Sequence, residues 1–204
     1  MEQILPLFSK PLFLKHINFS LKKTEGIIKK VKFKEANEKL SFEESQMSID
    51  TYVLDRPDFK FLKQILYKEL NAYTKDYLHY INNFKITTSW LTKIEPNSTS
   101  NLHNHQNCML SGVLYLNVDK DSGNIRFDSF ADSRYWLEKT DFDIFNSTGW
   151  FIEPSNKLLL IFPSEVHHIV EENKSKMTRY SLAFNAVPTG IVGEKDSDSH
   201  IKMS

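Results

Sequence analysis

The second half of the chain is a series of short apolar segments separated by turn-forming residues. Their lengths and their valine, isoleucine and aromatic content are typical of β-strands. Pro96, Pro163 and the stretch Asp119–Gly123 mark strand ends or turns. The segments predicted to be strands are Ile86–Glu95, Met109–Asn117, Asn124–Phe127, Gly149–Glu153, Lys157–Phe162, His167–Glu171 and Arg179–Val187. Such a set of strands buries its apolar faces by packing one sheet on another.

The first half of the chain has a different, helical periodicity. Apolar residues recur every three or four positions in Asp55–Ile81, which predicts a long helix with one face packed on a sheet. Leu21–Val31 carries a weaker helical pattern, and Lys32–Ser48 is polar and predicted to be mostly loop. Ile4–Lys15 contains two prolines, which favour an edge strand or an extended arm.

Helices followed by roughly eight short strands predict an α+β fold, mainly β. We expect a two-sheet jelly roll with the N-terminal helices packed on one sheet. Residues 1–188 would form a single domain, with helical support at 1–84 and the jelly-roll core at 85–188. The polar residues 189–204 are expected to form a flexible tail.

Composition excludes several classes of function. Lysine plus arginine and aspartate plus glutamate balance at 26 each, so charge favours no nucleic-acid partner. Cys108 is the single cysteine, which excludes an internal disulfide framework and is compatible with a reducing compartment. No apolar run approaches the ~18 residues of a membrane span, and the first residues lack a signal-peptide pattern. We expect a soluble, intracellular and cytoplasmic protein, with a homodimer through the Ile4–Lys15 arm left open.

The strongest chemical signal is a pair of histidines at the start of an apolar strand. His103 and His105 are one residue apart, and strand residues at this spacing face the same side. They could therefore present two imidazoles to one point, and neutral imidazole suits zinc, copper, iron and nickel. A third ligand should come from a distant strand, where His168 is the candidate. Arg179 follows in a second apolar strand, where it either has a buried partner, as an arginine inside the protein needs, or is an ordinary surface arginine.

These residues resemble the 2-oxoglutarate- and iron(II)-dependent oxygenases, whose double-stranded β-helix carries an H-x-D/E…H triad and a downstream arginine or lysine. The match is closer to a branch with H-x-H in place of the first two ligands, and prolyl-hydroxylase-like enzymes are also similar. It covers Trp90–Val187. The matching residues are His103, His105, Leu110-Ser111-Gly112-Val113, Tyr115-Leu116, Ser122-Gly123, Phe127-Asp128, Phe162-Pro163-Ser164, His168, Arg179, Ser181 and Phe184-Asn185.

The resemblance implies an oxidoreductase that hydroxylates a substrate with Fe(II), 2-oxoglutarate and dioxygen. It implies that His103, His105 and His168 are the metal ligands. His167 and His168 compete for the third position, and alternation puts them on opposite faces. The family pattern selects His168.

The resemblance also implies a binding site for the distal carboxylate of 2-oxoglutarate. Arg179 can hold a carboxylate bidentately, and Tyr115 matches the family position that donates a hydrogen bond to it. Ser181 belongs to the same pattern and is included as a cofactor-binding residue. For Tyr115, an ordinary place in the core is the alternative.

His105 departs from the wider superfamily, which carries aspartate or glutamate there. A three-histidine triad would leave the site one unit more positive. Alternatively, a carboxylate such as Asp128, a water or a halide completes the shell. Asp128 is otherwise expected to accept a hydrogen bond from a ligand histidine.

Two other functions compete with the oxygenase hypothesis. One is a cupin-like dioxygenase that uses three histidines without 2-oxoglutarate, and the other is a jelly-roll binding module without catalysis. The substrate would be a small molecule or a peptide. The aromatic-rich stretch Ser129–Thr148 is either its rim or lid, or a satellite cluster of core side chains.

Overall fold

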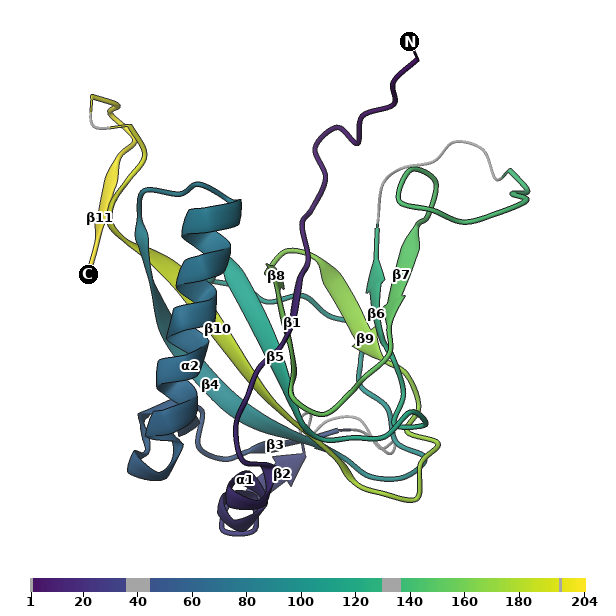
Figure 1. Cartoon of the computed structure of the whole chain (residues 1–204). Coiled ribbons are helices and arrows are strands. Elements are labelled where there is room, and N and C mark those ends of the chain that lie inside the picture. The colour runs from purple at the N-terminus through teal and green to yellow at the C-terminus, as the bar shows by residue number, and fades with distance from the viewer. Residues whose placement is uncertain (1, 36–44, 130–136, 195) are drawn as a thin grey trace.

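The computed structural model describes residues 2–35, 45–129, 137–194 and 196–204, which form two β-sheets with helices on the outside of the larger one (Figure 1). The larger sheet has the order β1-β8-β5-β10-β4-β3-β2, with β11 paired to β10. Its strands are β1 (Phe13–His16), β2 (Phe33–Glu35), β3 (Gln46–Ser48), β4 (Asn83–Ile94), β5 (Leu110–Asn117), β8 (Leu158–Pro163), β10 (Arg179–Val192) and β11 (Ile201–Met203). The smaller sheet has the order β7-β6-β9, from β6 (Ile125–Asp128), β7 (Gly149–Ile152) and β9 (His167–Val170). The prediction of a mainly β fold with few helices is confirmed.

Strand β8 shows why the sequence produces two packed layers. Leu159 and Ile161 belong to the core between the larger sheet and the helices. Leu158, Leu160 and Phe162 point to the other face and belong to a second core with residues of β5 and β6. A strand buried on both faces is continuously apolar, as the sequence from 158 to 162 is.

The helices cover the outer face of the larger sheet. Helix α1 spans Leu21–Ile28, where Ser20 caps the first turn by accepting a hydrogen bond from the Lys23 amide. Helix α2 spans Lys60–Asn71 and buries Leu62, Leu66 and Leu70 completely. The pattern of apolar residues every three or four positions therefore predicted the packed face of α2 correctly.

The predicted helix Asp55–Ile81 is wrong in its extent. Two 3₁₀ turns, η1 (Val53–Asp55) and η2 (Pro57–Phe59), precede α2, and a π-helical turn, η3 (Ala72–Tyr77), ends it. A π turn has more residues per turn than an α-helix, so the apolar face no longer follows the 3.6-residue period. Tyr73 is buried, but Tyr77 and Ile81 are 67% and 92% exposed.

The chain ends also differ from a simple strand-and-tail plan. Strand β10 continues past residue 188 to Val192, and β11 pairs with its last residues. The predicted loop Lys32–Ser48 contains β2 and β3, with residues 36–44 outside the described chain. Within the described residues, no helix has the length and apolarity that crossing a membrane would require.

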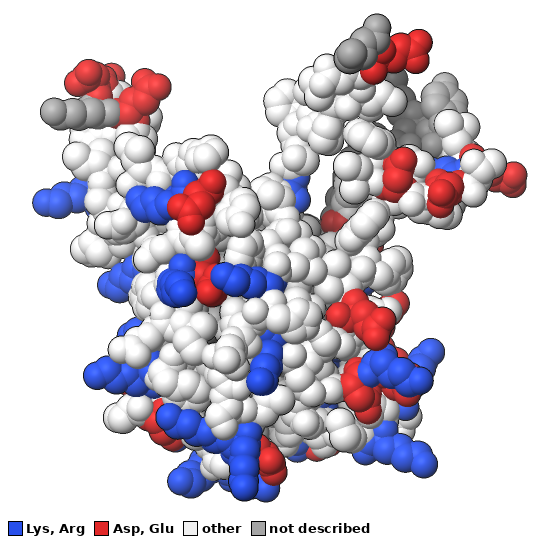
Figure 2. Space-filling view, in the orientation of Figure 1, with Lys and Arg blue, Asp and Glu red and all other residues white. Residues whose placement is uncertain are grey.

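Residues 137–148, which lead into β7, project away from the smaller sheet (Figure 1). Phe130, Tyr135 and Trp136 of the predicted aromatic rim lie outside the described residues. Phe142 and Phe145 are 68% and 53% exposed, which does not fit a buried satellite cluster. Figure 2 shows acidic side chains on this projection, whereas lysines and arginines gather over the helical side of the molecule.

Candidate metal centre and carboxylate site

Main-chain hydrogen bonds bring the three predicted histidines together from two distant segments. His103 forms an isolated antiparallel bridge with His168, in which each amide donates to the other's carbonyl at 3.0 and 2.8 Å. The amide of His105 donates to the carbonyl of Ser164 at 3.0 Å. The histidine segment therefore lies against β9 and the turn before it, at one end of the two-sheet layer.

The imidazoles of His103, His105 and His168 converge closely enough to share one ion. A ligand atom from each lies within 4.8 Å of those from the other two. Their ring centroids are 4.4, 5.1 and 5.3 Å apart. His167, the competing candidate, is not part of this group, and across the smaller sheet it is paired with Asp128.

The proton on two of the imidazoles is located by their backbone partners. His103 Nδ1 lies 2.7 Å from the carbonyl oxygen of Asn101, and His168 Nδ1 lies 3.1 Å from that of Val166. A carbonyl oxygen can only accept, so Nδ1 is the donor in each ring. The lone pair of each neutral ring is then on Nε2, which is the arrangement found in metal-ligating histidines.

Side chains rather than the backbone surround His105. Its Nδ1 lies 2.6 Å from Oδ1 of Asn185 and 2.8 Å from Oγ of Ser111. Ser111 Oγ also contacts Ser164 Oγ at 2.8 Å. The ring of Trp90 packs beside His105, with their centroids 5.6 Å apart.

The surroundings keep the buried imidazoles neutral. Burial, assisted by the nearby His103, lowers the pKa of His168 to about 3. Burial also lowers the pKa of His105, although its hydrogen bond to Asn185 acts in the opposite direction. Neutral imidazole is the form that binds a metal ion.

Arg179 lies in the same interior and is only half satisfied by the protein. Its side chain is 1% exposed, and Nη1 donates to the main-chain carbonyls of Ser122, at 2.9 Å, and Gly123. Nε and Nη2 are buried without a hydrogen-bond partner among the described residues, as is the hydroxyl of Tyr115. Buried donors of this kind are rare and costly unless something else supplies acceptors.

Tyr115 and Arg179 face each other without forming a hydrogen bond of good geometry. The guanidinium carbon lies 5.0 Å from the centre of the Tyr115 ring. Burial lowers the pKa of Arg179 and raises that of Tyr115, and each group partly offsets the shift in the other. The raised pKa of Tyr115 keeps its hydroxyl protonated, and a guanidinium has only donors to offer, so both groups present hydrogen-bond donors.

A tight turn holds the two carbonyls that bind Arg179. Gly123 has φ +78°, and a Cβ there would lie 2.3 Å from the carbonyl oxygen of Glu171, so only glycine fits. Asp119 fixes this turn because its Oδ1 accepts from Ser122 Oγ at 2.9 Å and its Oδ2 accepts from Ser175 Oγ at 2.6 Å. The Ser122-Gly123 motif thus orients the guanidinium.

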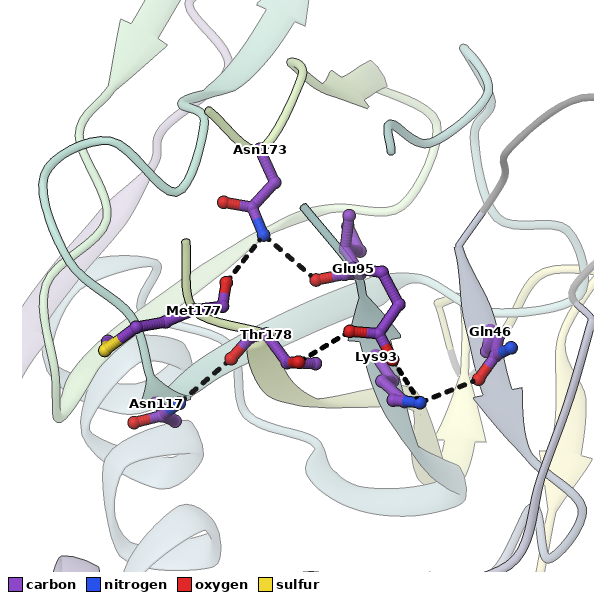
Figure 3. A network of polar contacts seen from close by, with 8 residues as sticks. Gln46, Lys93, Glu95, Asn117, Asn173, Met177 and Thr178 are labelled. Carbon is purple, nitrogen blue, oxygen red and sulfur yellow. Dashed lines mark hydrogen bonds and ion pairs between the residues drawn. The ribbon is translucent and has the colours of Figure 1, made fainter. Parts of the chain in front are cut away.

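The segment leading into Arg179 is fixed by a second polar network (Figure 3). The buried Asn173 donates to the carbonyls of Ile94 and Met177 at 3.1 and 2.9 Å. Thr178 Oγ1 donates to Glu95 at 2.6 Å, and the carbonyl of Thr178 accepts from Asn117 at 2.9 Å. These contacts tie residues 173–178 to β4 and β5 and so determine where β10 begins.

One face of β10 connects the histidines to the guanidinium. Leu182 and Phe184 point into the helix-side core, so alternation puts Arg179, Ser181 and Asn185 on the opposite face. Across the sheet Ser181 pairs with β5 at Tyr115, and Asn185 pairs with it at Ser111. The inner face of β5 and β10 therefore carries both groups of candidate residues.

The structure gives Asp128 a different partner from the ligand histidine or metal ion that the sequence suggests. Its Oδ2 instead accepts from Nε and Nη2 of Arg126 at 3.1 and 3.0 Å, and it is not in the histidine group. Asp128 alternates with Phe127, whose ring packs near His168, so its side chain points away from the histidines.

Sequence reasoning missed the residues that support this site. Asn185, Ser111 and Ser164 surround His105, while Ser122 and Gly123 hold Arg179. All of them stand in the quoted family pattern, so their presence there was the available signal. Their roles depend on which strands are neighbours, which spacing along the chain does not reveal.

The sequence matches a known family over the stretch that carries these residues. Residues 88–185, slightly less than half of the chain, match the family described as "Putative 2OG-Fe(II) oxygenase". No curated protein sequence matches significantly.

Solved structures share the fold at low sequence identity. HygX from Streptomyces hygroscopicus, with nickel, 2-oxoglutarate and hygromycin B bound, has TM-score 0.64 and 11% identity over 88% of this chain and 84% of its own. A Pseudomonas putida prolyl-4-hydroxylase has TM-score 0.58 and 16% identity over 88% and 94%. A Trichoplax adhaerens prolyl hydroxylase, in complex with a hypoxia inducible factor peptide fragment, has TM-score 0.60 and 13% identity over 86% and 83%.

The predicted resemblance is therefore confirmed. Over residues 88–185 the chain is similar to the 2OG-Fe(II) oxygenases, and the solved structures share its fold.

Proposed function

We propose that this chain is a 2-oxoglutarate- and Fe(II)-dependent dioxygenase that hydroxylates a small-molecule or peptide substrate. His103, His105 and His168 would hold Fe(II), and Arg179 with Tyr115 would bind the distal carboxylate of 2-oxoglutarate. The proposal depends on the two guanidinium donors Nε and Nη2, which lie buried beside the Tyr115 hydroxyl and, like it, have no hydrogen-bond partner in the described part of the chain. A carboxylate would satisfy all three at once.

The three histidines fit the metal as well. Each can turn an unprotonated Nε2 toward a common point, and three neutral imidazoles suit a divalent first-row ion. When bound, Fe(II), 2-oxoglutarate and dioxygen supply the oxidising chemistry. The chain's own residues hold the ion, fix the orientation of the 2-oxoglutarate and exclude water around its buried carboxylate.

The two sheets support a double-stranded β-helix. In this interpretation β8, β5, β10 and β4 form the major sheet, and β7, β6 and β9 form the minor sheet. The bridge between His103 and His168 would be what remains of a fourth minor strand. The helical residues 1–84 and the strands from 85 to 188 would act as one domain.

Using three histidines instead of two and a carboxylate changes the charge of the centre. Three neutral ligands leave the ion's full charge, so the carboxylate at the keto-acid end of 2-oxoglutarate would offset part of it, while the distal carboxylate would pair with Arg179. The buried donors of Arg179 and Tyr115 that lack acceptors among the described residues favour a site that uses 2-oxoglutarate over a cupin-like site that does not.

The experiment is an anaerobic reconstitution with Fe(II), followed by 2-oxoglutarate binding and then exposure to air. We expect 2-oxoglutarate to bind in the presence of metal, and slow conversion to succinate even without substrate. The test variant is Arg179→Met, and its matched control is Arg126→Met. Arg126 lies on β6, and its ion pair with Asp128 is partly exposed. Metal binding without any effect of 2-oxoglutarate would instead support the three-histidine dioxygenase, and failure to retain metal would support a binding module.

A further inference from the structure

His105 differs from the other two histidines in what holds its Nδ1 atom. In His103 and His168, Nδ1 lies against a main-chain carbonyl two residues earlier in the chain. Such an acceptor stays in place whatever side chains surround it. The acceptor for His105 is Oδ1 of Asn185, which is 80 positions away in sequence and lies on β10.

The amide of Asn185 is itself held in one orientation. Its Nδ2 donates to Thr88 Oγ1 on the neighbouring strand β4 at 3.3 Å. Its Oδ1 accepts from Ser111 Oγ at 2.9 Å, on the neighbour on the other side, β5. With the NH₂ group directed at Thr88, the carbonyl end of the amide faces His105.

This orientation determines where His105 carries its proton. An amide oxygen has no proton to give, so the 2.6 Å contact requires that Nδ1 is the donor. The lone pair is then on Nε2. Without the Asn185 acceptor, Nδ1 would keep its 2.8 Å contact with Ser111 Oγ, a hydroxyl that can either donate or accept, so either nitrogen of the neutral ring could carry the proton. An Nε2–H ring cannot bind a metal through that atom.

We propose that Asn185 is a positioning residue for the metal centre. It accepts the Nδ1 proton of His105 and thereby fixes both the tautomer and the ring orientation that turn Nε2 toward His103 and His168. Thr88 and Ser111 keep the amide oxygen directed at the ring. The inference rests on the proposed function, because it gives Asn185 a role toward the ion that the histidines would hold.

The test combines the metal-free protein with Co(II) binding. Asn185→Leu has a similar volume and no acceptor, whereas Asn185→Asp keeps an acceptor oxygen. Nitrogen-15 NMR of the imidazoles should show His105 protonated at Nδ1 in the wild-type protein and in Asn185→Asp. In Asn185→Leu we expect a mixture of tautomers and a Co(II) affinity about 10- to 100-fold weaker, with altered visible absorption of bound Co(II).

The control is Asn82→Leu. Asn82 also bonds to β10, through the carbonyls of Thr189 and Ile191, and neither of these bonds involves a histidine. Its Co(II) affinity should match the wild type. Thr88→Val, which keeps the shape and removes only the acceptor for Asn185 Nδ2, provides a milder test should Asn185→Leu fold poorly, with an expected loss of about two- to fivefold.

The outcomes separate this inference from the proposed function. Wild-type binding of Co(II), with an Asn185→Leu variant that keeps both the affinity and the Nδ1 tautomer, would overturn the role of Asn185 alone. Equal losses in Asn185→Leu and Asn185→Asp would also overturn it, because the acceptor would then not matter. A wild-type protein that binds no Co(II) would overturn the metal centre and this inference together.

Discussion

The site has a histidine end, formed by His103, His105 and His168, and an arginine end, formed by Arg179 and Tyr115. The two ends differ in whether the protein itself supplies hydrogen-bond partners for their polar atoms. At the histidine end every imidazole has a partner for Nδ1, and exposure ranges from the open His103 to the buried His168. At the other end Arg179 is 1% exposed, and two of its three nitrogens lack a partner among the described residues. At the histidine end the protein itself supplies a partner for every Nδ1 atom. At the arginine end the unpaired donors would find acceptors only in a bound ligand.

This difference predicts how stability and binding are linked. Buried donors without acceptors cost stability in the ligand-free protein, and a bound carboxylate would recover that cost. Substitutions at the histidine end should therefore weaken metal binding with little gain in stability. Those at the arginine end should weaken 2-oxoglutarate binding while leaving the free protein as stable or more so.

Loss of a metal ligand should give the largest effect. His168→Ala is expected to weaken Co(II) or Ni(II) binding by more than about 100-fold, beyond the effect of losing an outer partner. Titration followed by visible absorption measures it. The neighbouring His167→Ala is the control, and we expect its affinity to be unchanged because its ring is outside the histidine group. A larger effect from His167→Ala would transfer the ligand role to that residue.

The next effect tests the arginine end directly. Arg179→Met replaces the buried guanidinium by an unbranched apolar side chain and so removes the charge. It should weaken 2-oxoglutarate binding by about 30-fold or more. Calorimetry on the Ni(II)-loaded protein measures this, with Arg126→Met as the control. The thermal midpoint of the ligand-free variant should be unchanged or higher, since unsatisfied donors are removed.

The comparison between the two ends fails if Arg179→Met behaves otherwise. A variant that unfolds at much lower temperature, yet still binds 2-oxoglutarate normally, would make the guanidinium a structural group. Its bonds to Ser122 and Gly123 would then be its whole function.

Tyr115→Phe should have a smaller effect of the same kind. It removes a hydroxyl that has no hydrogen-bond partner among the residues that the structure describes, so the free energy of unfolding should stay nearly constant. The affinity for 2-oxoglutarate should fall about tenfold, the usual effect of one hydrogen bond to a charged group. Tyr73→Phe is the control, because it removes a hydroxyl that does have a protein partner: Tyr73 donates to the carbonyl of Pro11 at 2.8 Å. It should lose about 1 kcal/mol of stability without affecting 2-oxoglutarate.

Much of the fold could be predicted because it follows from burial. The continuous apolar run of β8 and the apolar face of α2 each reflect which neighbours the residues pack against. The π turn after Asn71 could not be predicted, since the apolar spacing continues through it while the helix geometry changes. The pairing of residues 201–203 with β10 has no strong apolar signal in its polar surroundings.

The site divides in the same way. His103, His105, His168 and Arg179 could be selected because metal and carboxylate binding require particular side chains at particular spacings. The residues that hold these side chains could not be selected, because their roles depend on the strand register. Asn185 reaches His105 because β10 pairs with β5 in the register that places Asn185 opposite Ser111. Main-chain acceptors, such as those that hold Arg179, require no particular side chain, and glycine is needed at Gly123 because of its turn and not because of its bond to Arg179.

The smallest expected effect concerns the turn that holds Arg179. Ser175→Ala removes the hydrogen bond that Ser175 Oγ donates to Asp119 Oδ2, which ties that turn to the segment before β10, and the one that it accepts from the Met177 amide. We expect a loss of about 1 kcal/mol in the free energy of unfolding. The affinity for 2-oxoglutarate should fall only about threefold, because the Ser122 and Gly123 carbonyls keep their partner but are held less firmly.

Denaturant unfolding and calorimetry measure the two quantities, and Ser155→Ala, which removes an exposed contact with His16, is the control. An affinity loss as large as that of Arg179→Met would mean that the turn, rather than the unpaired donors, determines binding at this end.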